Sequence, residues 1–336
     1  MQPVTRVALP RVGLLGNPSD LFGGRVISFT FDAFAARVTA ADAERLVLAS
    51  CTPAGWSADG LGAAVAELRP RELRGGAELL GAALRRFALH APEALAGGRG
   101  GLRLEFDCDV PLQSGLSGSS AIVVATLRAL AAFFDEPLGP FEVAELALAA
   151  ETEELGLVAG PQDRVVQAYE GLVDMDFSRP RSPDAYTPLD PALLPPLFVA
   201  WDPEPGASSH GAHAVVRGRW ERGEPEVERA VTRLAELAGE GLVCLRERDG
   251  SRLRALVDEN QDVRASVWGT GPRDRELVAI GRSAGAGVKL CGSGGAVLGV
   301  MEGGGGYDEV REAYAEQGYR VLRPRVARSR ERAAIR

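Results

Sequence analysis

The segment PLQSGLSGSSAIVVATLRALAAFF, from Pro111 to Phe134, changes from a glycine- and serine-rich loop into an almost wholly apolar stretch without glycine or proline. The apolar part predicts a buried helix. Glycine loses more conformational entropy on folding than other residues, so such a loop indicates that something approaches its backbone closely. The free N–H groups and partial positive charge of a helix's first turn favour an anion, most often a phosphate. The segment therefore predicts a phosphate site, with a tight structural turn as the alternative.

The composition limits the classes of function. A chain of 336 residues is long enough for one large domain or two modest ones. With 46% hydrophobic and 25% charged residues, it predicts a packed core and not disorder. The net charge of −8 argues against a nucleic-acid binder, which would show a basic surface. Arginine supplies all the basic residues except Lys289, the only lysine.

Neither a membrane span nor a secretory leader is evident in the sequence. No stretch approaches about 18 uninterrupted apolar residues, and no long apolar segment precedes a small-residue cleavage site near residue 1. The four cysteines, Cys51, Cys108, Cys244 and Cys291, are scattered and form no C-x-x-C pair, which favours reduced thiols. We therefore expect a soluble, cytoplasmic protein without a membrane partner; the sequence leaves the oligomeric state open.

Helical and strand patterns are mixed along the chain without regular alternation. The predicted strands are Val7–Leu15, Val26–Ala40, 102–111, 172–177, 197–202, the two flanking the glycine turn of 288–300, and 319–324. The predicted helices are 119–134, Glu78–Leu89, 140–155, Val227–Glu240, Gly241–Arg246, Leu253–Val257, Glu276–Ala284 and Tyr307–Gln317. This order favours an α+β fold over a doubly wound sheet. A proline-rich segment, Pro180–Pro196, predicts a crossing into a second half of the chain.

The loop Gly115–Ser120 is not a standard phosphate-binding P-loop, because it lacks the lysine of G-x-x-x-x-G-K-[ST]. The hydroxyl of Ser120 is suited to bind Mg²⁺ or to cap the following helix. A second glycine turn, CGSGGAVLGV (Cys291–Val300), is ordinary hairpin chemistry by itself. Together, the two loops predict a pair of backbone segments that close over one polyphosphate.

Three segments resemble the motifs of one enzyme family. PLQSGLSGSSA resembles the central ATP loop of the GHMP kinases, which include galactokinase, homoserine kinase, mevalonate kinase and phosphomevalonate kinase. LPRVGLLGNPSD resembles their N-terminal motif, and KLCGSGGAVLGV resembles their C-terminal motif. The three occur in the family's order and spacing, so the resemblance covers essentially the whole chain.

Four further runs are most similar to the glucuronokinases within this family. They are RVGLLGNPSDLFGGRVISF, GLVAGPQDRVVQAYEGLVDMDF, HAVVRGRW and NQDVRASVWG. The resemblance implies an ATP-binding N-terminal domain over 1–190, similar to domain 2 of ribosomal protein S5, and a ferredoxin-like C-terminal domain over 191–336, with ATP between them. It implies ATP contacts from two loops: Pro111, Gly115, Leu116, Ser117, Gly118, Ser119, Ser120 and Ala121 in the first, and Gly292, Ser293, Gly294 and Gly295 in the second.

The resemblance also implies the residues that act in phosphoryl transfer. Asp163 matches the family aspartate that orients or deprotonates the attacking hydroxyl, a task that suits a carboxylate. Glu151 matches the glutamate that holds Mg²⁺ together with the loop serine, here Ser120. Arg11 corresponds to a basic residue near the transferred phosphoryl group, where a cation stabilises developing charge. The alternatives are an exposed acid in a turn for Asp163, a solvated acidic helix face for Glu151 and a surface ion pair for Arg11.

The implied substrate contacts begin with Asp20, which matches the aspartate that holds sugar hydroxyls; a turn-forming aspartate in N-P-S-D is the alternative. A uronic acid carries a carboxylate, which arginine binds in a bidentate manner. Arg164, next to Asp163, is the first candidate for this contact, and Arg217 and Arg264 are others.

The N-terminal motif departs from two relatives of the family. Asn17-Pro18 stands where galactokinases carry a Glu-His pair, and Arg11 stands where mevalonate kinases carry a lysine. The resemblance to the glucuronokinases therefore implies an ATP- and Mg²⁺-dependent kinase that phosphorylates the anomeric hydroxyl of D-glucuronate. The alternatives are a GHMP kinase for a heptose phosphate, galactose or mevalonate, and a non-catalytic nucleotide- or sugar-binding regulator.

Overall fold

The computed structural model describes residues 2–50, 55–96, 100–204, 210–303 and 306–326. The chain forms two compact units that interleave in sequence. The first unit combines residues 1–10, 34–110 and 118–168, and the second combines 11–33, 111–117 and 169–336. Neither unit is one continuous stretch, because the chain changes unit after residues 10, 33, 110, 117 and 168. The domain boundary predicted between residues 190 and 191 stays a prediction.

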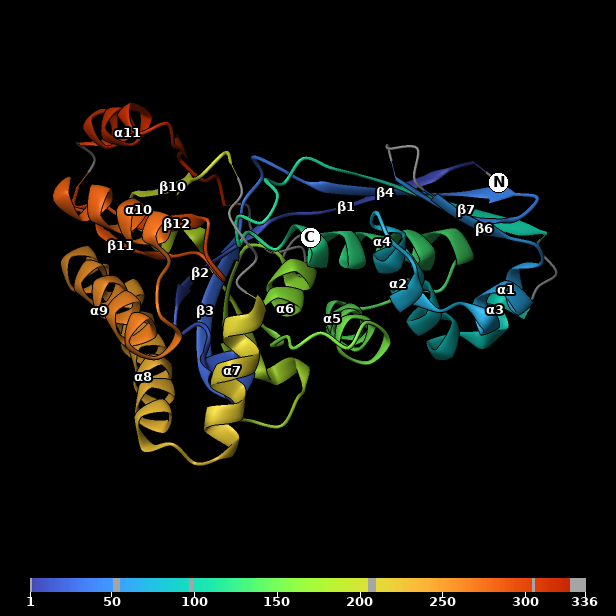
Figure 1. Cartoon of the computed structure of the whole chain (residues 1–336), viewed down its shortest axis with the longest axis horizontal. Helices are drawn as coiled ribbons and strands as arrows, with labels where there is room; N and C mark the ends of the chain where they lie inside the picture. The colour runs from blue at the N-terminus through green and yellow to red at the C-terminus, as the bar shows by residue number, and fades with distance from the viewer. Residues whose placement is uncertain (1, 51–54, 97–99, 205–209, 304–305, 327–336) are drawn as a thin grey trace. The chain divides into compact units, whose positions relative to one another are not determined.

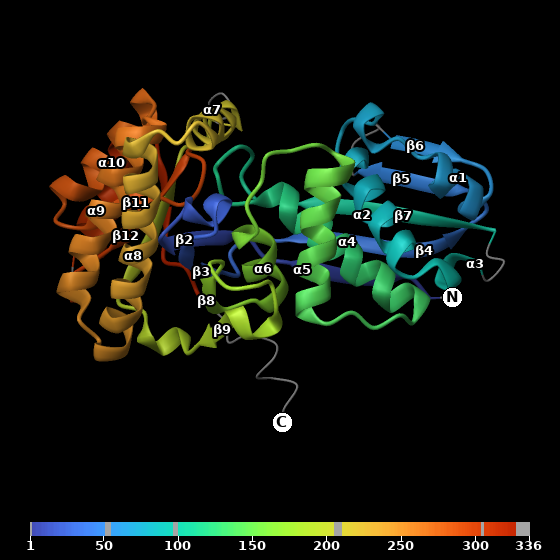
Figure 2. The ribbon, with the colours of Figure 1, turned by 90° about the horizontal axis from the view of Figure 1, so that it is seen from below.

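The first unit is built on a five-stranded sheet in the order β1-β4-β7-β5-β6. Its strands are β1 (Val4–Ala8), β4 (Ala36–Ala43), β5 (Leu46–Ser50), β6 (Gly55–Ala58) and β7 (Gly101–Cys108). Neighbours are antiparallel except β5 and β7, which are parallel. The helices α2 (Ala77–His90) and α4 (Gly118–Phe134) gather on one face of this sheet (Figures 1 and 2). The other helices of the unit are α1 (Leu61–Glu67), α3 (Pro92–Ala96), α5 (Pro140–Ala149) and α6 (Gln162–Tyr169).

Helix α4, which follows the glycine loop, is the central helix of the first unit. Most of its side chains are buried, as expected for a helix that is apolar on nearly all sides. Its one charged residue, Arg128, donates hydrogen bonds to the carbonyl oxygens of Val7 (2.8 Å), Gln167 (3.0 Å) and Ala168 (2.9 Å). Arg128 therefore ties α4 to β1 and α6.

The second unit contains two four-stranded antiparallel sheets. One has the order β2-β3-β8-β9, with β2 (Arg11–Leu15), β3 (Arg25–Thr30), β8 (Leu172–Asp176) and β9 (Tyr186–Leu189). The other has the order β11-β12-β10-β13, with β10 (Leu197–Trp201), β11 (Gly287–Leu290), β12 (Ala296–Val300) and β13 (Arg320–Leu322).

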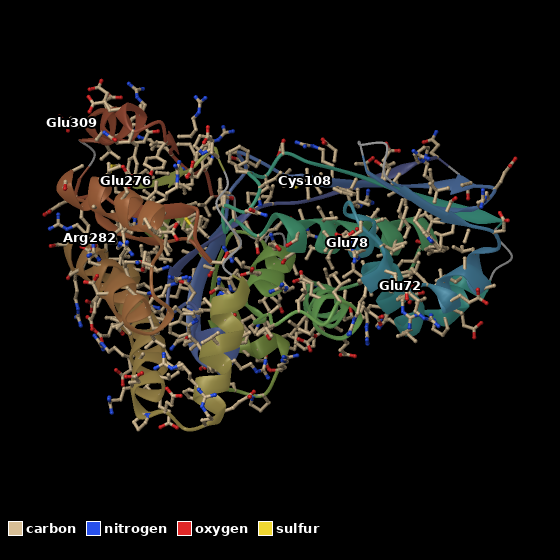
Figure 3. All side chains as sticks on the ribbon, in the orientation of Figure 1. Glu72, Glu78, Cys108, Glu276, Arg282 and Glu309 are labelled. Atoms are coloured by element: carbon tan, nitrogen blue, oxygen red, sulfur yellow. The ribbon has the colours of Figure 1, made fainter. Side chains whose placement is uncertain are left out.

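Five α-helices belong to the described part of the second unit. They are α7 (His210–Glu221), α8 (Pro225–Glu247), α9 (Gly250–Trp268), α10 (Pro272–Ser283) and α11 (Tyr307–Glu316). Helices α8 and α9 lie side by side (Figure 1). Arg282 of α10, labelled in Figure 3, donates to Asp258 of α9 at 2.7 Å. The phenyl ring of Phe198 and the hydroxyphenyl ring of Tyr314 meet in the core between sheet and helices.

The predicted α+β class is confirmed, but several element boundaries are wrong. Val7–Leu15 is not one strand: Leu9-Pro10 divides it into β1 and β2, which belong to different sheets. Val26–Ala40 likewise becomes β3 and β4, separated by a turn over 31–35. The two helices predicted on either side of Glu240 are one helix, α8. A β-carbon on Gly241 would lie 2.2 Å from Leu15 Cδ1, so this glycine permits close packing and does not end the helix.

Cys108, Cys244 and Cys291 are free thiols, in agreement with the expectation of reduced cysteines, while Cys51 lies outside the described residues. Among the helices that the structure describes, none is both long and apolar enough to span a membrane.

Candidate active site

Strand β2 and two loops from distant parts of the sequence meet in the second unit. The backbone N–H of Arg11 donates to the carbonyl oxygen of Leu116 at 3.1 Å. The N–H of Gly13 donates to the carbonyl oxygen of Cys291 at 2.9 Å. The Arg11 guanidinium donates to the carbonyl oxygens of both Gly115 and Cys291. The first strand of the N-terminal motif therefore holds the central loop and the C-terminal glycine turn together.

The glycines of these two loops are required where one backbone touches the other. Gly115 has a φ of +66°, and a β-carbon on it would lie 2.6 Å from the carbonyl oxygen of Gly294. A β-carbon on Gly292 would lie 2.5 Å from the carbonyl oxygen of Gly115 and 2.6 Å from Arg11 Nη1. At these positions each loop therefore requires glycine, because the backbone of the other loop lies too close for a side chain. Binding of a phosphate by the same backbone stays a prediction.

Gly292→Ala should separate the two loops. The added methyl group displaces the Gly115 carbonyl and the Arg11 guanidinium, so we expect the free energy of unfolding to fall by about 1–3 kcal/mol. If the predicted role of this loop in ATP binding holds, we also expect ATP to bind about tenfold more weakly, because the substitution displaces the loop. Urea unfolding and equilibrium titration with ATP measure the two effects. Gly239→Ala is the matched control, since nothing lies within 4 Å of its β-carbon position on α8; equal behaviour of the two variants contradicts the expectation.

The turn that carries Asp20 is anchored by a buried lysine. Asp20 is 9% exposed and lies in a 3₁₀ turn, Ser19–Phe22. Lys289 holds the chain just before this turn. Its Nζ donates to the Gly13 carbonyl oxygen (2.8 Å) and to Asn17 Oδ1 (2.6 Å), and also to the Leu290 carbonyl oxygen (3.0 Å). Lys289 is fully buried, and this burial lowers its pKa to about 7.

A neighbouring amide fixes the other side of the same turn. Asn260 on α9 accepts a hydrogen bond from the Gly16 N–H at 2.7 Å and donates one to the Asn17 carbonyl oxygen at 3.3 Å. Sequence reasoning missed both Lys289 and Asn260. The sequence did contain a signal for Lys289, because a lysine within an otherwise apolar strand is not expected to lie on the surface.

Asp163, Arg164 and Glu151 lie in the first unit, the first two on α6 and Glu151 in the helical segment Ala150–Glu154 before it. Arg164 forms a buried ion pair with Glu151 and donates to the Gly160 carbonyl oxygen at 2.7 Å. Its Nη1 also lies 3.9 Å from Asp163 Oδ2. The Asp163 side chain is 18% exposed, and its Oδ1 accepts a hydrogen bond from Gln162 at 3.3 Å. Arg164 thus has acidic partners within the protein, and its role in binding a substrate stays a prediction.

The comparisons with known proteins agree with one another. The pattern described as GHMP kinases N terminal domain matches residues 78–171. Glucuronokinase 1 of Arabidopsis thaliana is 37% identical over 304 residues, which cover 86% of this chain and 82% of the relative. The chain belongs to the GHMP kinase family.

Solved structures of GHMP kinases share its fold. The mevalonate kinase of Methanococcus jannaschii superposes with a TM-score of 0.77 at 16% identity, covering 97% of this chain and 98% of that one. The galactokinase of Lactococcus lactis superposes with a TM-score of 0.78 at 14% identity, covering 98% and 94%. At these identities the likeness establishes the fold alone.

GHMP kinases use ATP, generally with Mg²⁺, and two residues of the first unit fit such a cation. Glu151 Oε1 is buried and has no hydrogen-bond partner among the described residues. A buried carboxylate oxygen without a donor is costly, and a cation would satisfy it. Ser120, 1% exposed in the first turn of α4, offers a hydroxyl oxygen. The described residues contain no group of three or more acids, histidines or cysteines placed to hold a metal ion, so further ligands would come from the nucleotide, as is common for Mg²⁺.

Proposed function

We propose that this protein is an ATP- and Mg²⁺-dependent kinase that phosphorylates the anomeric hydroxyl of D-glucuronate to give glucuronate 1-phosphate. The observation that supports this most strongly is the 37% identity to Glucuronokinase 1, because it extends over most of both chains. The meeting of the three motif segments in the second unit adds support from the geometry. We also propose that residues 1–190 form the ATP-binding domain and that 191–336 form the C-terminal domain.

In this proposal the predicted residues divide the tasks of phosphoryl transfer among them. The backbone of Gly115–Ser120 binds the triphosphate, and Gly292–Gly295 closes over it. Asp163 accepts the proton of the anomeric hydroxyl, and the cation of Arg11 stabilises charge on the transferred phosphoryl oxygens. Asp20 holds sugar hydroxyls, while Ser120 and Glu151 hold Mg²⁺. When bound there, Mg²⁺ neutralises charge on the phosphate oxygens.

A charged pocket discriminates strongly among the substrates of this family, since they differ by a carboxylate or a phosphate. We therefore expect Mg²⁺ and ATP to support turnover on D-glucuronate at least about 100-fold better, as kcat/KM, than on galactose, a heptose 7-phosphate or mevalonate. A coupled ADP assay measures turnover, and phosphorus NMR identifies the product.

Turnover on another member of this panel, but not on glucuronate, refutes the proposed substrate and retains the kinase. The absence of turnover on every member, with ATP still bound, favours the regulator that was the alternative from the sequence.

A further inference from the structure

The side chain of Arg264 is a buried cation that forms no ion pair with any acid among the described residues. It is 4% exposed, and the carboxylate of Asp274 acts on it electrostatically but lies beyond ion-pair distance. Its two hydrogen bonds, to the carbonyl oxygens of Gly269 and Ser293, are both 3.5 Å long. Its Nε has no acceptor among the described residues. A buried guanidinium in this condition is costly unless an anion completes it.

A second buried donor lies on the same face of the same helix. Trp268 follows Arg264 by four residues on α9, so the two side chains project from one face, a single turn apart. Trp268 is 8% exposed, and its indole Nε1 also lacks an acceptor among the described residues. Buried indole N–H groups ordinarily have a partner. Two neighbouring donors without acceptors point to one missing ligand that carries oxygen atoms and negative charge.

The surroundings place this pair beside the predicted sugar site. The ring of Trp268 meets the ring of Phe22 edge to face, with centroids 6.1 Å apart, and Phe22 also packs on Trp220 at 5.0 Å. Phe22 ends the 3₁₀ turn that carries Asp20. The donors therefore lie next to the segment proposed to hold sugar hydroxyls, among aromatic rings that suit the apolar face of a sugar.

The other candidate arginines each form an ion pair with an acid. Arg164 is paired with Glu151 in the first unit. Arg217 is half exposed on α7 and pairs with Glu221 one helical turn away, at 3.1 Å. On the edge of Arg264 that contains Nε and Nη2, Nε has no acceptor among the described residues, and Nη2 has the 3.5 Å contact to the Ser293 carbonyl oxygen. This is the edge that binds a carboxylate through two parallel hydrogen bonds.

We infer that Arg264 and the indole N–H of Trp268 bind the carboxylate of the sugar acid and so determine the specificity of the enzyme. The inference rests on the proposed function, which supplies the carboxylate. It replaces Arg164 with Arg264 as the carboxylate ligand. Because Arg264 also contacts the Ser293 carbonyl of the second glycine loop, a nucleotide phosphate is the competing source of the oxyanion.

The test compares variants of the full-length protein on sugars with and without the acid group. Arg264→Gln should reduce kcat/KM for D-glucuronate by about 100-fold, mainly through KM, because a charge-assisted pair is lost. Trp268→Phe keeps an aromatic ring but removes one donor, so it should reduce kcat/KM for D-glucuronate about tenfold. For both variants the KM for MgATP should stay close to the wild-type value, as should any turnover on D-glucose, which has a CH₂OH group in place of the carboxylate.

Arg252→Gln is the matched control. Arg252 is an exposed arginine on the same helix, with a 3.3 Å contact to Glu240, so its substitution should leave kcat/KM for both sugars unchanged. If Arg264→Gln does not fold, Trp268→Phe and calorimetric titration of the wild-type protein with glucuronate and glucose provide the same comparison.

The outcomes separate the inference from the proposed function. If the wild-type enzyme phosphorylates glucuronate and both variants keep its KM, the inference is wrong and the function stands. An equal rise in the KM for MgATP assigns the oxyanion to the nucleotide and also overturns the inference. If the wild-type protein neither binds nor phosphorylates glucuronate, the proposed function fails and the inference fails with it.

Discussion

Asp163→Asn should reduce kcat on the sugar acid by about 10³-fold, within the range of rate that general base catalysis contributes. Asparagine has the same shape as aspartate, but it cannot accept a proton from the attacking hydroxyl. The side chain is 18% exposed, and its contacts with Gln162 and Arg164 are 3.3 Å and 3.9 Å long. We therefore expect little change in the free energy of unfolding or in ATP affinity. Initial rates at saturating substrates, together with urea unfolding, measure these quantities.

Glu153→Gln is the control for this loss of activity. Glu153 is also acidic and lies ten residues earlier, but it is 60% exposed and pairs with Arg86 at 2.8 Å. Its substitution should leave kcat unchanged. An Asp163→Asn variant that retains most of its wild-type kcat would show that the base is another group or that none is needed.

Lys289→Met should change how stability depends on pH. The pKa of Lys289 is about 7 in the folded protein, mainly through burial, and ordinary, near 10.5, in the unfolded chain. Between these values the unfolded chain binds more protons than the folded protein, so this lysine makes the free energy of unfolding rise with pH. The wild-type protein should gain up to about 5 kcal/mol over the variant between pH 7 and pH 10.5, since each unit of pKa corresponds to about 1.4 kcal/mol.

The charged groups around Lys289 favour this direction. Arg11 and Arg264 are cations and lower the pKa of Lys289 further. Cys291 is the nearby group that can become an anion, but burial raises the pKa of its thiol to about 12, so it stays neutral over this range. Urea unfolding of the wild-type protein and the variant, at intervals across the range, gives the difference directly.

Cys291→Ser is the control for the titration of the thiol, because it keeps Lys289 and should therefore keep its rising contribution. A difference between the wild-type protein and Lys289→Met that does not vary with pH would show that Lys289 has the same pKa in both states.

The sequence predicted best those features that depend on local pattern. Helix α4 was predictable because an apolar run of its length, without a breaker, has few alternatives to a buried helix. The two glycine loops were predictable as a pair. Residues 7–15 were predicted wrongly, because alternation of apolar residues marks a strand but not its partner. The change of sheet at Pro10 depends on pairing with β4 and β3, which are distant in sequence.

The candidate site was predicted in its residue types more than in its contacts. Arg164 was chosen because it follows Asp163, but adjacency in sequence does not reveal its buried ion pair with Glu151, and its role in binding a substrate stays a prediction. Arg264 was one arginine among many, and its missing partner becomes visible only when the neighbours of α9 are known. Burial and pairing are properties of the packed chain, so neither could be derived from composition or spacing.

The enclosed position of Lys289 has a consequence for chemical modification. As the only lysine, it is the one side chain in this sequence that reagents specific for primary amines can acylate. Its amine is fully buried and donates to three oxygen acceptors, so the folded protein presents no lysine amine to solvent. Acylation at residue 289 would therefore report that the turn before Asp20 had come away from β11. Because this amine is inaccessible while the turn is closed, the extent of its acylation measures the opening of that turn.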